Sequence, residues 1–199
     1  MDMTGEERIA QSRAVVYAAL NDPEILRQCL PGCQSLEKTS DTGMEATVGL
    51  AVGPIKATFK GAVTLSDLDP PRGYRISGEG KGGAAGFAKG HATVTLVEDG
   101  DGTLLRYAVH VDVGGKLAQL GGRLIDSTAR KLSAEFFSRF GALVGTAEPE
   151  PVVVEAVAVP ASAPPPAPAG RGVPWNVRLF AVSAGAVVLA AFALLLLGR

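Results

Sequence analysis

The chain has 199 residues, enough for one domain of ordinary size and a further segment. Its net charge of −1 gives no basic character, so the composition does not favour binding to nucleic acid. Two cysteines, Cys29 and Cys33, are too few for a disulfide-stapled secreted scaffold, and the acidic N-terminus lacks the apolar core of a signal peptide, so we expect the body of the protein in the cytoplasm.

The first thirty residues predict a strand followed by two short helices. Residues 4–9 have the character of a short strand, and residues 13–20 that of a helix with an apolar inner face. Asp22 is a good N-cap for the second helix, because its carboxylate can accept from the first free amides, and Pro23 suits the first helical position. The Pro-Gly pair at 31–32 ends this helix.

A long run of strands follows. Gly-Pro, Asp-Pro-Pro and Asp-Gly turns and a tract of glycines separate its members. Apolar and other side chains alternate with a period of two along residues 44–52, 55–65, 74–76, 92–96 and 105–113. Alternation of this kind predicts antiparallel strands with one covered face.

Helical periodicity begins at Lys116 and continues to about Val144, which predicts one helix of roughly 43 Å at 1.5 Å per residue. The stripe that should face inward contains Leu117, Leu120, Leu124, Thr128, Leu132, Phe136, Phe140 and Leu143. The order of strand, two helices, five or six strands and long helix predicts an α+β fold, in which a strongly curved antiparallel sheet grips the C-terminal helix. Such a sheet cannot lie flat along a straight helix, so the gap between them is a natural apolar cavity.

The glycine tract, GEGKGGAAGFAKG at residues 78–90, contains the pattern G-x-G-x-x-G of dinucleotide-binding loops. A dinucleotide loop needs a helix N-terminus after it, whereas this sequence continues as another strand, HATVTLV. We therefore reject a nucleotide site. Two interpretations stay open: a hairpin corner that needs glycine for its bends, or a flexible cavity mouth or partner-docking loop.

After the globular part, residues 1–145, the composition changes twice. Residues 146–173 are rich in Ala, Val and Pro and cannot pack a core, which predicts a disordered linker spanning roughly 80 Å when fully extended. Residues 174–199 contain 19 uncharged residues, Leu179 to Leu197, flanked by tryptophan and arginine. Because about 20 apolar residues cross the hydrocarbon core of a bilayer, we predict a C-terminal transmembrane helix that anchors the domain to the cytoplasmic membrane.

Three segments of the domain carry a family resemblance: LNDPEILRQCLPGCQSLEKTSD, VGPIKATFKGAVTLSDLDPPRGYRISGEGKGGAAGFAKG and GGKLAQLGGRLIDSTARKLSAEFF. They resemble the CoxG family, named for the G subunit of carbon monoxide dehydrogenase, in the START-like, or SRPBCC, superfamily. The likeness extends over residues 1–145. The resemblance implies a helix-grip fold with a hydrophobic pocket. It also implies an accessory, non-catalytic role beside a molybdenum hydroxylase of the carbon monoxide dehydrogenase type, in membrane attachment and in handling membrane quinone.

The expected cavity supplies the candidate binding site. Strand residues of one parity should line it, leucines of the long helix should close it, and the one large apolar residue of the glycine tract joins them. The ligand-binding candidates are Leu50, Phe59, Val63, Phe87, Tyr107, Val109, Leu117, Leu120 and Leu124. These residues would equally make a solid core. The pair Gly121-Gly122 favours a cavity that can open, although close packing on the sheet would explain these glycines equally well.

No catalytic or metal-binding constellation follows from the sequence. Cys29 and Cys33 supply two thiolates where a zinc site needs four ligands. The two histidines, His91 and His110, lie in separate strands, and their spacing indicates no shared acid or nucleophile. We therefore expect neither a bound metal nor a catalytic site.

These observations lead to one expected function and two alternatives. We expect a membrane-tethered, non-enzymatic protein that carries an isoprenoid quinone, menaquinone or ubiquinone, between the bilayer and the molybdenum hydroxylase that the resemblance implies. The first alternative is a solid adaptor that docks the dehydrogenase at the membrane through the glycine tract. The second is an enzyme of the cyclase type, which would need a polar group in the cavity.

Overall fold

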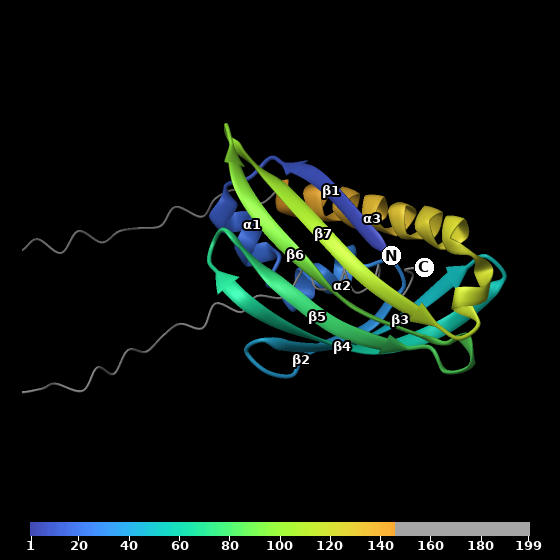
Figure 1. Cartoon of the computed structure of the whole chain (residues 1–199). Coiled ribbons are helices and arrows are strands. Elements are labelled where there is room, and N and C mark those ends of the chain that lie inside the picture. The colour runs from blue at the N-terminus through green and yellow to red at the C-terminus, as the bar shows by residue number, and fades with distance from the viewer. Residues whose placement is uncertain (146–199) are drawn as a thin grey trace, which may run out of the picture.

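The computed structural model of the chain describes residues 1–145, which form one curved sheet and the helices that close it (Figure 1). The strands are β1 (Asp2–Ile9), β2 (Cys33–Lys38), β3 (Gly43–Val52), β4 (Ile55–Asp69), β5 (Gly73–Lys81), β6 (Phe87–Asp99) and β7 (Gly102–Gly114). The helices are α1 (Arg13–Ala19), α2 (Pro23–Cys29) and α3 (Gly122–Gly145), with two 3₁₀ turns, η1 (Gly83–Ala85) and η2 (Leu117–Leu120).

The predicted linker, residues 146–173, and the predicted membrane segment, residues 174–199, lie outside the described residues. Within residues 1–145, no helix combines the length and the apolar character needed to cross a bilayer.

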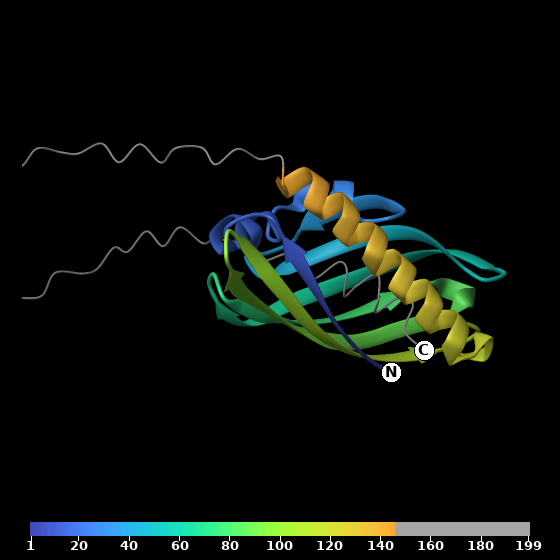
Figure 2. The same cartoon turned by 90° about the horizontal axis from the view of Figure 1, so that it is seen from above.

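All seven strands belong to one antiparallel sheet with the order β1-β7-β6-β5-β4-β3-β2. The first strand pairs with the last, with Asp2 opposite His110 and Ile9 opposite Thr103. The sheet bends strongly, and α3 lies along its concave side (Figure 2). The prediction of a curved antiparallel sheet around a C-terminal helix is therefore confirmed.

The start of α2 follows the predicted capping chemistry. The Asp22 carboxylate accepts hydrogen bonds from the amides of Glu24 at 2.8 Å and Ile25 at 3.4 Å, with Pro23 in the first turn. The strand that comes next, β2, was not predicted. Only Leu36 among its six residues is buried, so its sequence lacks the apolar alternation that marks the other strands.

The long helix differs from the prediction in its first turn. The expected single helix from Lys116 to Val144 is wrong, because Gly121 has φ +82° and separates η2 from α3. A left-handed residue cannot continue a right-handed helix, and glycine adopts that conformation without a steric penalty. The buried stripe of α3 shifts accordingly and consists of Ile125, Ala129, Ser133, Phe136, Phe137, Phe140 and Val144.

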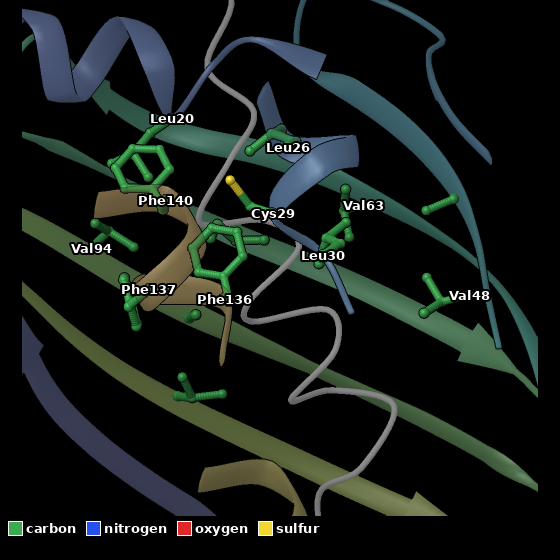
Figure 3. Close-up of a cluster of buried hydrophobic side chains, with 14 of the residues drawn as sticks. Leu20, Leu26, Cys29, Leu30, Val48, Val63, Val94, Phe136, Phe137 and Phe140 are labelled. Carbon is green, nitrogen blue, oxygen red and sulfur yellow. The ribbon is translucent and has the colours of Figure 1, made fainter. Parts of the chain in front are cut away.

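The part of the core beside α1 and α2 is filled by large side chains (Figure 3). Three phenylalanines from the second half of α3 meet Leu20, Leu26 and Leu30 there. Phe136 and Phe140 stack with ring centroids 5.8 Å apart, and Phe137 meets Phe136 edge-on at 5.2 Å. Both geometries are favourable for aromatic pairs, so this half of the interior is solid.

Candidate functional site

The strand positions predicted to line the interior do point to the concave face. Leu50, Phe59, Val63 and Val109 are all buried, and Tyr107 is partly buried. The strand register supports this orientation, because each of these residues is paired with an inward-facing residue of the neighbouring strand. Phe59, for example, is paired with Val48. On η2, Leu117 is fully buried and Leu120 packs partly buried against the same core.

Two of the nine candidates lie elsewhere. Phe87 opens β6 opposite Lys81 and shares its parity with Lys89, which places it on the outer face of the sheet, 46% exposed. Leu124 is 36% exposed at the start of α3 and lies over the β3–β4 turn, where its Cδ2 would be 2.6 Å from a Cβ on Gly53. The structure therefore brings seven candidates together and separates these two from them.

Towards the β5–β6 connection, the inward face of the middle strands contains several glycines and alanines. Two rows cross the sheet directly from strand to strand, and we call them the glycine rows. The first consists of Ala46, Gly61, Gly80, Ala88 and Val113. The second consists of Met44, Val63, Gly78, Gly90 and Val111. A solid core needs large side chains to reach native packing density, and the four glycines of these rows carry none, although Val63 covers Gly78.

The path of α3 leaves the middle of the sheet less closely covered. The helix packs on α2 and approaches the sheet at β1 on one side and β3 on the other, with no comparable approach to β4, β5 or β6. Those three strands carry the glycines of both rows. Within residues 1–145, β7 is likewise not closely approached, so the wider spacing extends from β4 to β7 and includes the glycine-bearing strands.

Hydroxyl groups complete the wall of this region. Ser133, on the inner face of α3, is 6% exposed, and its hydroxyl interacts with the Tyr107 phenol, which opposes part of the rise in the pKa of that phenol. Tyr107 stacks on Phe137 with ring centroids 5.7 Å apart, and burial raises the pKa of its phenol, which stays protonated. The buried Tyr17 hydroxyl has no partner within residues 1–145, but it belongs to the filled half of the interior, where its ring meets Tyr74 edge-on at 5.8 Å. A lone hydroxyl on an apolar helix face gives no periodic signal, so sequence reasoning missed Ser133 and Tyr17.

The glycine tract is a close-packed connection. It joins β5 to β6 through the three-residue η1, so the prediction that a strand follows the tract is confirmed. Gly82 lies under the ring of Phe59, whose nearest atom would be 2.2 Å from an added Cβ. Gly86 has φ +121° and approaches the backbone of Gly114 just as closely. The tract thus fixes Phe59 in the wall of the interior.

The glycines of the helix break are explained differently. A Cβ added to Gly121 or Gly122 would meet nothing within 4 Å among the described residues. Close packing on the sheet, one of the two interpretations of this pair, is therefore wrong. Gly121 is required by its positive φ, and Gly122 borders open space.

The cysteines lie beside the solid half of the core. Cys29 is fully buried, and burial raises the pKa of its thiol to about 11, so the thiol is protonated at neutral pH. Among residues 1–145, no three His, Cys, Asp or Glu side chains are placed to hold a metal ion.

Spacing along the chain did not reveal one polar cluster. His91 and His110 stand directly opposite each other in β6 and β7 and stack with centroids 5.4 Å apart. His110 Nδ1 lies 2.8 Å from Asp2 Oδ1, so the pair does have an acid neighbour. Both rings line a hollow of about 540 Å³ on the outer face, together with Lys89. The tight turn at 99–102 fixes this register, and counting outward from it would have found the pair.

A curved antiparallel sheet closed by a C-terminal helix, with an apolar concave face, defines a helix-grip protein of the START-like class. Solved structures share this fold. A conserved protein from Geobacillus kaustophilus is 27% identical with a TM-score of 0.69, over 73% of this chain and 95% of that chain. An uncharacterized protein from Rhizobium leguminosarum is 17% identical with a TM-score of 0.57, over 73% of this chain and 94% of that one. Ara h 8.0201 is 16% identical with a TM-score of 0.54, over 74% and 99%.

The family assignment rests on residues 5–145, which match the sequence profile of CoxG, the G subunit of carbon monoxide dehydrogenase. The chain belongs to this CoxG family, as the three segments had indicated. A comparison with curated proteins found no significant match.

Proposed function

We propose that this chain is a non-enzymatic carrier that holds an isoprenoid quinone between α3 and the glycine rows and delivers it to a molybdenum hydroxylase of the carbon monoxide dehydrogenase type. The observation that carries the proposal is the pair of glycine rows beneath a helix that approaches the sheet on either side of them. A floor with four glycines and two alanines leaves room for a prenyl chain, since hydrocarbon burial at about 25 cal/mol per Å² depends on area rather than on specific partners.

The hydroxyls of the wall suit the head group of such a ligand. A quinone ring carries two carbonyl oxygens, which accept hydrogen bonds but cannot donate them. When the hydroxyls of Ser133 and Tyr107 bond to each other, one donates to the other, and the second proton is left free for such an oxygen. Leaving such a donor unsatisfied costs about 1–3 kcal/mol, so a carbonyl acceptor would be favoured over a plain hydrocarbon.

The membrane and the partner enzyme complete the proposal. The family's description names carbon monoxide dehydrogenase, which supports an accessory role beside such an enzyme. The uncharged stretch within residues 174–199 supports an anchor in the cytoplasmic membrane, and the Pro-rich residues 146–173 support a tether. The domain would then move between bilayer and enzyme while the chain stays attached.

The experiment is a loading assay on the full-length protein with two leucine variants. The protein is incubated with menaquinone or ubiquinone in mild detergent, purified again and analysed by mass spectrometry. We expect about one quinone per wild-type chain and at least tenfold less for Gly61→Leu, because this side chain would occupy the first glycine row. Ala62→Leu, on the exposed outer face at the next position, is the matched control and should load like wild type.

The outcomes separate the carrier from its alternative. If wild-type protein holds no quinone, the carrier function is excluded. If Gly61→Leu unfolds while Ala62→Leu does not, the interior is already full, and an adaptor without ligand is left. The solid phenylalanine half of the core favours that second candidate, since a rigid domain suffices to dock an enzyme.

A further inference from the structure

Three connections of the chain gather at one end of the molecule, as both views show (Figures 1 and 2). They are the β3–β4 turn, the β5–β6 connection and the link from β7 into α3, each taken together with the bordering residues of its strands or helix: residues 53–56, 82–88 and 114–124. We call this the basic end. Its three segments contain Lys56, Lys116 and Arg123 and no acidic residue.

These three cations are free to meet a partner. All are exposed, and no ion pair within residues 1–145 involves any of them. The nearest carboxylates along the chain, Asp112 and Asp126, flank the third segment. The basic end therefore presents uncompensated positive charge.

Two large apolar side chains are exposed at the same end. They are the two binding candidates that the structure separates from the interior, Phe87 and Leu124. Each rests on a glycine, the ring of Phe87 against Gly114 and Leu124 over Gly53, so both are supported on firm backbone. Exposed apolar groups beside cations are the composition that binds at the surface of a bilayer.

The other end of the molecule has the opposite charge. The β4–β5 turn with the end of β4 (residues 66–72) and the β6–β7 turn with its flanking residues (98–102) form what we call the acidic end. They contain one arginine and five carboxylates, Asp67, Asp69, Glu98, Asp99 and Asp101. Arg8 and Arg13 form ion pairs with three of these carboxylates, which leaves an excess of two negative charges. A negatively charged surface would attract one end of the domain and repel the other, which fixes its orientation.

We propose that the basic end docks on an anionic lipid bilayer, with Phe87 and Leu124 at the level of the acyl chains and the three cations among the lipid phosphates. The inference rests on the proposed function, which it extends by naming the face that meets the membrane. The first glycine row reaches this end, since Ala88 is the last residue of the segment 82–88 and pairs with Gly80. Docking in this orientation brings the ligand's space to the bilayer surface.

The linker length permits this orientation. The tether begins at Gly145, and α3 is about 36 Å long at 1.5 Å per residue. A chain of the 28 residues 146–173 can span roughly 85 Å at about 3.1 Å per residue, more than twice that length.

The test measures how deeply each end enters a bilayer. The full-length chain contains a single tryptophan, Trp175, which is changed to phenylalanine. In that background Phe87→Trp and Leu124→Trp place an indole at the basic end, and Leu68→Trp, 43% exposed at the acidic end, is the matched control. Each protein is reconstituted into vesicles of phosphatidylglycerol or phosphatidylcholine with brominated acyl chains, which quench tryptophan only on contact.

We expect brominated phosphatidylglycerol to quench the indoles at positions 87 and 124 at least twofold and the indole at 68 hardly at all. In phosphatidylcholine the quenching at 87 and 124 should fall severalfold. Equal quenching at all three positions, absence of quenching at 87 and 124, or equal quenching in both lipids would overturn the proposal. A basic end that binds an acidic protein surface instead would give no quenching in either lipid.

Charge variants provide the second readout. The triple change Lys56→Gln, Lys116→Gln, Arg123→Gln should abolish quenching at position 87 in phosphatidylglycerol. The control is a triple change that alters the net charge equally but lies away from the basic end: Arg27→Gln, Lys38→Gln, Arg106→Gln. This control should leave the quenching at position 87 unchanged. If both triples act alike, bulk charge is responsible and the docking face is wrong. Quinone loading in detergent involves no bilayer, so failure of the carrier function and failure of docking are seen separately.

Discussion

The two ends of this domain are built on opposite principles. Towards the acidic end, stacked phenylalanines fill the interior, and arginines bind the turns: Arg8 reaches Asp99 and Asp101 at 2.8 Å each, and Arg72 reaches Asp69 at 2.7 Å. Towards the basic end, the sheet offers glycine rows, and its cations have no partner within residues 1–145. Exposed ion pairs are worth little individually, so the difference in stability comes from the packed rings.

This contrast indicates a division of labour within one small domain. A filled half stabilises the fold, and that stability allows the other half to keep small side chains and exposed apolar groups. The following predictions test the division, beginning with the largest effect.

Truncation in the filled half should be severe. Phe140→Ala removes a fully buried ring that stacks on Phe136, and we expect the free energy of unfolding to fall by about 3–5 kcal/mol. Leu143 precedes Val144, the last residue of the buried stripe, and is itself 38% exposed. Leu143→Ala should therefore change the free energy of unfolding by less than about 0.5 kcal/mol. Urea denaturation of both variants measures the difference, and similar losses would contradict a solid core at Phe140.

Alanine substitutions at the helix break should have opposite signs. Gly121→Ala forces a side chain into φ +82° and should cost roughly 1–2 kcal/mol. Gly122→Ala has open space and no positive φ, so reduced freedom of the unfolded chain should stabilise the protein by roughly 0.4–1 kcal/mol. Thermal unfolding followed by circular dichroism distinguishes them, and two changes of the same sign would mean that the break is placed wrongly.

The smallest effect lies on the outer face between the two ends. The hydrogen bond from His110 lowers the pKa of the Asp2 carboxyl below its ordinary 3.8. A lowered acid pKa contributes stability that is present above pH 3.8 and disappears as the pH falls through the folded value. An NMR titration should give the Asp2 carboxyl a midpoint below 3.8. His110→Ala should return that midpoint to its ordinary value, whereas His91→Ala should leave it lowered. A normal midpoint in the wild type would show that this contact does not form in solution.

Much of the scaffold could be predicted because its signals are local. The alternation in β3, β4, β6 and β7 survives because one face of each strand is buried and the other is wet. The α2 cap needs only Asp22 and the amides two and three residues on. The helix after β7 was predicted, but the break at Gly121 was not. The sequence does not determine whether a glycine within a periodic stretch adopts a positive φ.

The site was harder, because it depends on which face of the sheet each residue joins. Phe87 begins its strand, where alternation has no preceding residue to set the parity, and it points outward. The glycine rows arise from register across β4, β5 and β6, and pairs such as Gly61 with Gly80 are far apart in sequence. Periodicity within one strand carries no information about its neighbours, so the floor of the interior could not be found from the sequence.

The pairing of the first strand with the last governs how the protein can be made. The amino group of Met1 donates to the carbonyl of Val111 at 2.8 Å, and residues 2–9 find their partners only in residues 103–110. During translation, β1 therefore stays unpaired until most of the domain has left the ribosome. Contacts between residues so far apart in sequence also form slowly. A tag fused to the N-terminus would therefore lie beside the β1–β7 pairing, which forms late. At the opposite edge of the sheet, β2 pairs with β3 across a short local turn.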